Sequence, residues 1–152
     1  MAPKEKKGLW KVKVFIDGAS RGNPGPAGIG VVIKDMSGNI IKKHSEYIGD
    51  NKTNNQAEYI ALIRALEICM GICRGEIFVF SDSELLIKQL HGRYRIKAPH
   101  LRKLLEEVKI KEQFFQRVEY SFIKRDRNNL ADKLANMAID DALMNGNGRD
   151  IY

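Results

Sequence analysis

The run Ile77-Phe78-Val79-Phe80 restricts the fold of this chain more than any other segment. Its residues are apolar at successive positions, so a strand built from them presents apolar side chains to both faces of a sheet. Such a strand is typical of a sheet interior that helices cover on both sides. A helix-like segment precedes it, and a strand reached through a helical crossover can lie parallel to its neighbour. The run therefore indicates an α/β fold with a partly parallel sheet.

Alternating and apolar patterns predict the other elements around this inner strand. A strand over 12–17 puts Val12, Val14 and Ile16 on one face and Lys13, Phe15 and Asp17 on the other, and 36–39 is a hairpin signal between two further strands. The expected strands cover 12–17, 27–34, 40–49, 76–81 and 116–123, and the expected helices cover 53–70, 82–89, 99–113 and a segment after 128. The order βββαβααβα implies a five-stranded mixed sheet with helices on both faces.

Length and composition fit a single domain. With 152 residues, of which 43% are hydrophobic and 30% charged, the chain can bury a substantial core. We expect this domain over 9–144, a flexible basic tail at 1–8 and a loosely held tail at 145–152. No run approaches the ~20 apolar residues of a membrane span, and the first residues lack the apolar stretch of a signal peptide. These features predict a cytoplasmic protein without membrane contact. We also expect a monomer.

Charge and cysteine content limit the classes of function that fit this chain. The net charge of +7 favours a polyanionic partner, although the same excess can serve solubility alone. Cys69 and Cys73 lie four apart in a stretch that we interpret as helical, and their spacing matches no zinc pattern. We expect both to be buried, reduced thiols.

Four acidic residues occupy positions where a carboxylate is costly to bury. Asp17 and Asp82 end strand-like runs, whereas Glu58 and Asp132 fall early in helix-like segments. Carboxylates that are distant in sequence but lie at the ends of elements predict a shared divalent-metal site, because hard oxygen ligands suit Mg²⁺ and Mn²⁺. In a basic chain, this arrangement is typical of a nuclease.

Each acid also has an ordinary explanation. Asp17 before Gly18 is typical of a turn, and Asp82 is typical of a helix cap. Glu58 and Asp132 fit the first turn of a helix, where the helix dipole favours acids. These explanations are independent of one another, whereas a metal site accounts for all four acids together.

Four stretches of the chain closely resemble type 1 ribonuclease H, the family that cuts the RNA strand of RNA/DNA hybrids. In the family's order, they are Phe15–Gly18 with Gly22–Gly28, Thr53–Glu58, Ser81–Ser83 and Asn128–Ala135. The resemblance implies a ribonuclease H-like fold and an acidic tetrad of Asp17, Glu58, Asp82 and Asp132 that holds two Mg²⁺ or Mn²⁺ ions. It also implies an endonuclease that leaves 5′-phosphate and 3′-hydroxyl ends.

The same resemblance implies substrate contacts. Asn23, Asn54 and Asn55 match positions that contact 2′-hydroxyls and base edges in the minor groove of the hybrid, and Thr53 matches a position that helps hold a DNA-strand phosphate. The alternatives are that Asn23 serves only a turn and Thr53 only a helix cap.

Three features differ from the common family pattern. Glu84 stands where glutamine is usual, two residues after Asp82, and its added negative charge could weaken substrate contact. The basic segment with Arg93, Arg95 and Lys97 resembles an abbreviated form of the protrusion that grips the DNA strand, and a solvated helix face is the alternative. The loop at 124–127 lacks the histidine that many relatives carry before the last aspartate. In this it resembles the histidine-lacking, archaeal-like branch of the family.

Other functions remain open. The chain could also cut double-stranded RNA, as some archaeal-like relatives do, or bind hybrids without catalysis. It could instead cut DNA, as do the transposases, integrases and resolvases in which the same fold appears. A pure binder gains nothing from four crowded acids, and the stretches Gly22–Gly28 and Thr53–Glu58 favour ribonuclease H.

Overall fold

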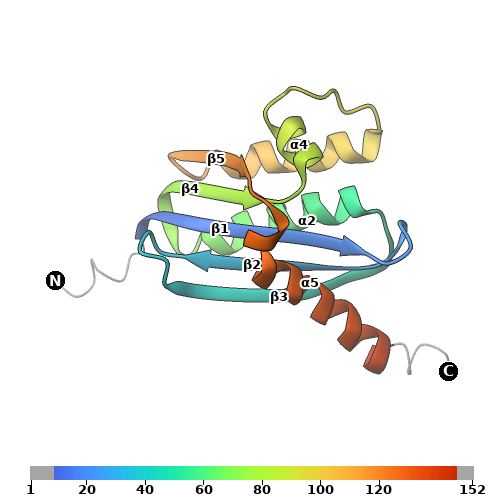
Figure 1. Ribbon diagram of the computed structural model, residues 1–152. Coiled ribbons are helices and arrows are strands. Elements are labelled where there is room, and N and C mark those ends of the chain that lie inside the picture. Colours follow the sequence, from blue (N-terminus) through green and yellow to red (C-terminus); the bar gives the residue numbers. More distant parts are fainter. Residues whose placement is uncertain (1–8, 147–152) are drawn as a thin grey trace.

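The computed structural model describes residues 9–146. The tail expected at 1–8 and most of the one expected at 145–152 lie outside these residues. The described elements, labelled as in Figure 1, are β1 (Leu9–Ser20), β2 (Gly25–Lys34), β3 (Ile40–Lys52), α2 (Asn54–Cys69), β4 (Cys73–Ser81), α3 (Glu84–Leu90), α4 (Pro99–Glu112), β5 (Arg117–Phe122), η1 (Arg125–Arg127), α5 (Asn129–Asp141) and η2 (Ala142–Gly146). Over this range no helix combines the length and apolar character needed to cross a membrane.

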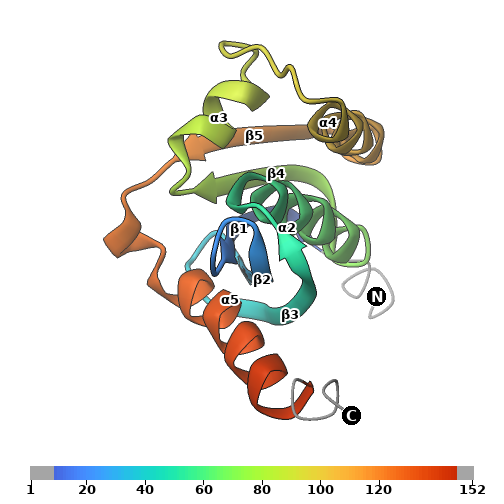
Figure 2. The same ribbon diagram turned by 90° about the vertical axis from the view of Figure 1, so that its right-hand side faces the viewer.

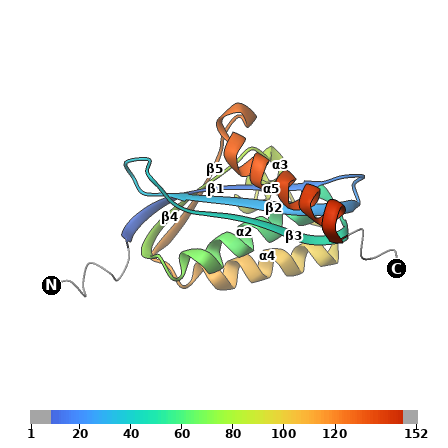
Figure 3. The same ribbon diagram turned by 90° about the horizontal axis from the view of Figure 1, so that it is seen from below.

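The five strands form one mixed sheet in the order β3-β2-β1-β4-β5. β2 pairs antiparallel with β1 and β3, whereas β4 pairs parallel with β1 and β5. The apolar run Ile77–Phe80 therefore lies in an inner strand, as predicted. Figures 2 and 3 show α5 on one face of the sheet and α2 and α4 on the other, which confirms the predicted architecture.

The main core lies between the sheet and α2. Val12, Val14 and Ile16 point from β1 toward Leu62 and Leu66 of α2, and all five side chains are fully buried. A smaller cluster lies under α5, where Val32 of β2 meets Ala131 and Leu134. This alternation along β1 leaves Asp17 on the face of α5, opposite the main core.

Glycines bring both helices that carry site acids onto the sheet. The glycine-rich stretch from Asp17 to Gly30 is mostly strand, because β1 continues to Ser20 and β2 begins at Gly25. A Cβ atom on Gly18 would collide with the backbone of Ala57 in α2, and one on Gly30 would collide with the carbonyl oxygen of Ala131 in α5. Only glycine permits these close approaches. They place Glu58 and Asp132, the residues that follow Ala57 and Ala131, next to the end of β1.

The cysteines differ from the predicted arrangement in one respect. Cys69 ends α2, but Cys73 opens β4 and is not helical, because the chain turns between them. Both thiols are free and buried, as expected. Burial raises the pKa of the Cys69 thiol to about 12, so this side chain stays protonated and behaves as an apolar core residue.

Candidate metal and nucleic-acid site

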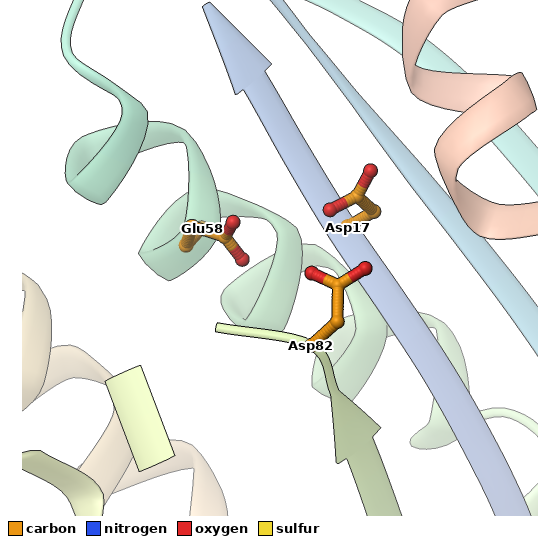
Figure 4. Close-up of side chains that lie close together, drawn as sticks. All are labelled: Asp17, Glu58 and Asp82. Carbon is orange, nitrogen blue, oxygen red and sulfur yellow. The ribbon is translucent and has the colours of Figure 1, made fainter. Parts of the chain in front are cut away.

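Three carboxylates converge at one edge of the sheet. Asp17 lies near the end of β1, Asp82 follows β4 directly, and Glu58 reaches the same point from α2 (Figure 4). One carboxylate oxygen from each residue lies within 4.8 Å of the others. Because β1 and β4 are parallel neighbours, their carboxyl ends meet at the same edge, and this explains why residues so distant in sequence come together.

Asp132 lies beside this cluster, in the first turn of α5. It lines the same hollow as the other three acids, and its proximity raises the pKa of the Asp17 carboxyl group. The Asn136 amide nitrogen lies 3.3 Å from Asp132 Oδ1, and Arg125 Nη2 lies 3.8 Å from the same oxygen. The structure thus brings all four predicted acids to one hollow, with Asp132 adjoining the group of three.

Burial and mutual repulsion make the ionised forms of these acids costly. Burial is the main cause that raises the pKa of Asp17 to about 8, and the charges of Asp82 and Asp132 raise it further. Burial, followed by the charges of Asp17 and Asp82, raises the pKa of Glu58 well above its ordinary value. Burial also raises the pKa of Asp82. The charge of Arg125 opposes all three shifts but does not outweigh burial and the like charges.

The ordinary explanations fail for three of the four acids. Asp17 lies within β1 opposite Gly30 and is not a turn residue. Asp82 is not a cap, because Ser83 is the N-cap of α3 and its hydroxyl accepts a hydrogen bond from the Leu86 amide. Glu58 lies beyond the first turn of α2. Asp132 does lie in a first turn, where the helix dipole favours it.

A second hollow adjoins the acids and gathers the predicted minor-groove contacts. Its lining includes Asn23, Thr53, Asn54 and Asn55, together with Glu58 from the acidic cluster. The four polar residues come from the β1–β2 turn and the start of α2, more than twenty positions apart in the chain. The sequence analysis did not assign His100, Ser83 or Leu85 to this site, although they line the same hollow.

Backbone N–H groups fix the orientations of the Asn23 and Asn54 side chains. The Asn54 backbone N–H donates to Asn23 Oδ1 at 2.8 Å, and the Ser20 backbone N–H donates to Asn54 Oδ1 at 2.9 Å. Both side-chain oxygens are therefore used, and the amide NH₂ groups are left as donors for a ligand. Thr53 forms a capping box with Gln56, which confirms its structural role. Its phosphate contact stays a prediction.

Asn128 is a further site residue that the sequence analysis left without a role. Its buried amide nitrogen lies 2.8 Å from the Ile16 carbonyl oxygen and 3.4 Å from Asp82 Oδ2. It therefore connects the start of α5 to the ends of β1 and β4 through these two contacts. The contact joins residues 46 positions apart, which no local pattern indicates.

The predicted basic segment lies apart from both hollows. Arg93, Arg95 and Lys97 are exposed in the connection between α3 and α4, so the interpretation as a helix face is wrong. Ile96 between them is only 8% exposed and anchors the segment to the core. A contact between these three side chains and a more distant part of a bound duplex stays a prediction.

Replacing Arg93, Arg95 and Lys97 together with alanine is expected to weaken the salt dependence of hybrid binding. Each lost phosphate contact removes about 0.7–0.9 from the log–log slope, so the slope should fall by roughly two to three. Fluorescence anisotropy in EDTA at several salt concentrations measures this slope. Replacing the exposed Lys42, Arg74 and Lys109 is the matched control of equal charge. Equal slopes for the two triple variants would show that the segment only faces solvent.

Comparisons with known proteins find ribonucleases H among the relatives of this chain. Residues 15–138 match the family model described as reverse transcriptase-like. A ribonuclease HI of Halobacterium salinarum is 42% identical over 134 residues, which cover 87% of this chain and 66% of that protein. A bifunctional protein of Mycobacterium tuberculosis is 39% identical over 87% of this chain, and the chain spans only 36% of its length.

One solved structure is similar to this chain over nearly the whole length of the solved protein. It is the crystal structure of LC11-RNase H1 in complex with an RNA/DNA hybrid, 43% identical to this chain. The match covers 87% of this chain and 99% of that one, with a TM-score of 0.81.

Proposed function

The chain belongs to the type 1 ribonuclease H family, and from this premise we propose that it is a metal-dependent endoribonuclease that cuts the RNA strand of RNA/DNA hybrids. The products are 5′-phosphate and 3′-hydroxyl ends. The observation that carries the proposal is the convergence of the Asp17, Glu58 and Asp82 carboxylates within 4.8 Å, at the edge of a polar hollow in a basic chain.

The acids suit two Mg²⁺ or Mn²⁺ ions. The donor set consists of carboxylate oxygens, which hard divalent cations prefer. Glu58 Oε1 is buried and has no hydrogen-bond partner among the described residues, which is costly unless a cation takes that place. Asp17, Glu58, Asp82 and Asp132 would hold the ions, which supply activation of the attacking water and stabilisation of the leaving 3′ oxygen.

The surrounding side chains orient the acids and the substrate. The Asn128 amide faces Asp82 Oδ2 and limits the rotation of that carboxylate. The free NH₂ groups of Asn23 and Asn54 point to readout of 2′-hydroxyls, which only the RNA strand carries. Arg125 occupies the loop without a histidine and presents a cation next to the acids, where it can attract a backbone phosphate.

A strand-specific cleavage assay tests the proposal. Duplexes of RNA/DNA, RNA/RNA and DNA/DNA carry a label on one strand at a time and are incubated with Mg²⁺, Mn²⁺ or EDTA. We expect internal cuts in the RNA strand of the hybrid with either metal and none in EDTA. Equal cutting of both hybrid strands, or cutting that survives EDTA, would contradict the proposal. The RNA/RNA duplex decides whether double-stranded RNA is a second substrate.

A further inference from the structure

One half of a sheet face has no helical cover within residues 9–146. α5 packs mainly on β2, with edges on β1 and β3, whereas α2, α3 and α4 lie against the other face. Figures 1 and 2 show the same arrangement, with β4, β5 and the first half of β1 open on the side of α5. We call this surface the open face and define it by Lys11, Lys13, Phe15, Lys34, Lys43, Glu76, Phe78, Phe80, Arg117 and Glu119.

Three phenylalanines lie on the open face, with Phe15 at its border, where it packs against the cluster under α5. Phe15 of β1 stacks on Phe80 of β4, with ring centroids 5.0 Å apart and ring planes 20° apart. Phe78 follows on β4, opposite Lys13 of β1. All three rings are partly exposed, although aromatic side chains on a sheet are normally covered by a second layer. They form an aromatic surface that a planar ligand can stack on.

Basic side chains surround these rings. Lys34 Nζ lies 4.8 Å from the centroid of Phe15, and Arg117 Cζ lies 5.9 Å from that of Phe78. The open face carries five basic side chains and two acidic ones, Glu76 and Glu119. Arg117 forms ion pairs with both acids, at 3.6 Å and 2.9 Å. The surface therefore combines stacking rings with an excess of positive charge.

We propose that the open face binds single-stranded RNA, and that this RNA is an extension of the strand cut at the acidic cluster. Exposed sheet aromatics bind unpaired bases by stacking, and flanking cations hold the phosphates between them. A protein partner would not require the basic excess. A duplex cannot stack on the rings, because its bases are already stacked within it.

The position of the open face indicates which nucleic-acid strand of a bound hybrid reaches it. Phe15 and Asp17 lie two residues apart on the same side of β1, and Asp82 directly follows β4, two residues after Phe80. The Cα atoms of each such pair are thus about 7 Å apart, so the open face begins next to the acids. Phe15 and Lys34 also line a small hollow with Arg127 and Asn128, next to the cluster. The choice of RNA rests on the proposed function, because the strand at the carboxylates is the one that is cut.

Binding to hybrids with single-stranded extensions tests this inference. The probes are a blunt hybrid, hybrids with about eight extra uridines at the 5′ or 3′ end of the RNA, and hybrids with thymidines on the DNA strand instead. Affinities are measured in EDTA, so no cleavage is needed. We expect an RNA extension at one end to tighten binding about fivefold to tenfold, from one or two stacked bases. No gain at either RNA end, or an equal gain from a DNA extension, would overturn the proposal.

Two variants separate base stacking on the open face from the effect of losing any exposed aromatic ring. Phe78→Leu keeps an apolar side chain in the strand but removes the ring, and it should abolish the gain while leaving blunt-hybrid affinity and cleavage unchanged. Phe114→Leu is the matched control, because Phe114 is also exposed and has an arginine, Arg74, 5.6 Å above its ring. The control should keep the full gain. A gain that survives Phe78→Leu, or a dimer that dissociates on this substitution, would overturn the proposal.

These measurements distinguish failure of the inference from failure of the proposed function. A protein that cuts blunt hybrid but gains nothing from an extension retains the proposed function and lacks the RNA-binding surface. A protein that cuts no hybrid, yet still binds the RNA extension through Phe78, lacks the activity and retains the surface. The two results come from separate assays, one with metal and one in EDTA.

Discussion

Asp82→Asn is expected to lower the rate of hybrid cleavage by roughly a thousandfold or more. The substitution keeps the shape of the side chain but removes one of the three carboxylates that converge at the end of β4. A bound metal contributes several kcal/mol to transition-state stabilisation, and about 4 kcal/mol corresponds to a thousandfold in rate. Single-turnover cleavage with saturating protein measures the chemical step without product release.

The matched control for Asp82→Asn is Glu84→Gln. Glu84 lies two residues farther along and is exposed, so its substitution removes the same charge without touching the cluster. We expect this control to change the rate by less than about threefold, because exposed charges interact weakly through solvent. Similar losses in both variants would show that net charge, and not ligation by Asp82, governs cleavage.

The inner strand and the acidic cluster could be predicted because each depends on a simple rule. An apolar run reached through a helix predicts a parallel inner strand, and Ile77–Phe80 is one. Parallel neighbours end at the same edge, so acids at their ends meet there. The meeting of Asp17 and Asp82 therefore followed from the element order, and Glu58 joins them from α2, which packs on β1.

The glycines between Asp17 and Gly30 could not be interpreted from composition alone. Glycine is typical both of turns and of sites where two backbones approach closely. Gly18 and Gly30 belong to the second class, but this requires knowing that α2 and α5 cross the sheet at these two positions. The same limit applies to Asn23, whose partner Asn54 is 31 residues away.

Arg125 and Asn128 show where local patterns carry no information. The sequence analysis described the loop at 124–127 by the histidine that it lacks. In the structure, Arg125 lies beside the acids, where its charge partly offsets the rise in their pKa, and the Asn128 amide faces Asp82. Both contacts depend on how the start of α5 docks over the ends of β1 and β4, which is a property of the assembled sheet.

Without metal, the stability of the protein is expected to fall as the pH rises from about 4 to about 8. The pKa of Asp17 rises from its ordinary 3.8 to about 8 on folding, and that of Glu58 also rises. In this window the folded state retains protons that the unfolded state has released, so the free energy of unfolding decreases with pH. For Asp17, which is 5% exposed, the loss is on the order of several kcal/mol. This corresponds to roughly 10 °C in Tm for a chain of this size.

Bound metal and the substitution Asp82→Asn should both oppose this loss of stability, because each reduces the repulsion among the ionised acids. Mg²⁺ or Mn²⁺ binds only the folded cluster, so it should raise the Tm with concentration, most strongly near pH 8, where the acids are ionised. Asp82→Asn removes a charge that raises the pKa of Asp17, so in EDTA at pH 8 it should melt higher than wild type. Its response to metal should shrink, whereas Glu84→Gln should follow wild type in both respects. Thermal unfolding from pH 4 to 8, with EDTA or metal, measures all three proteins. If Asp82→Asn melts lower in EDTA and keeps the full metal response, Asp82 is a structural residue and the assignment of the metal site is wrong.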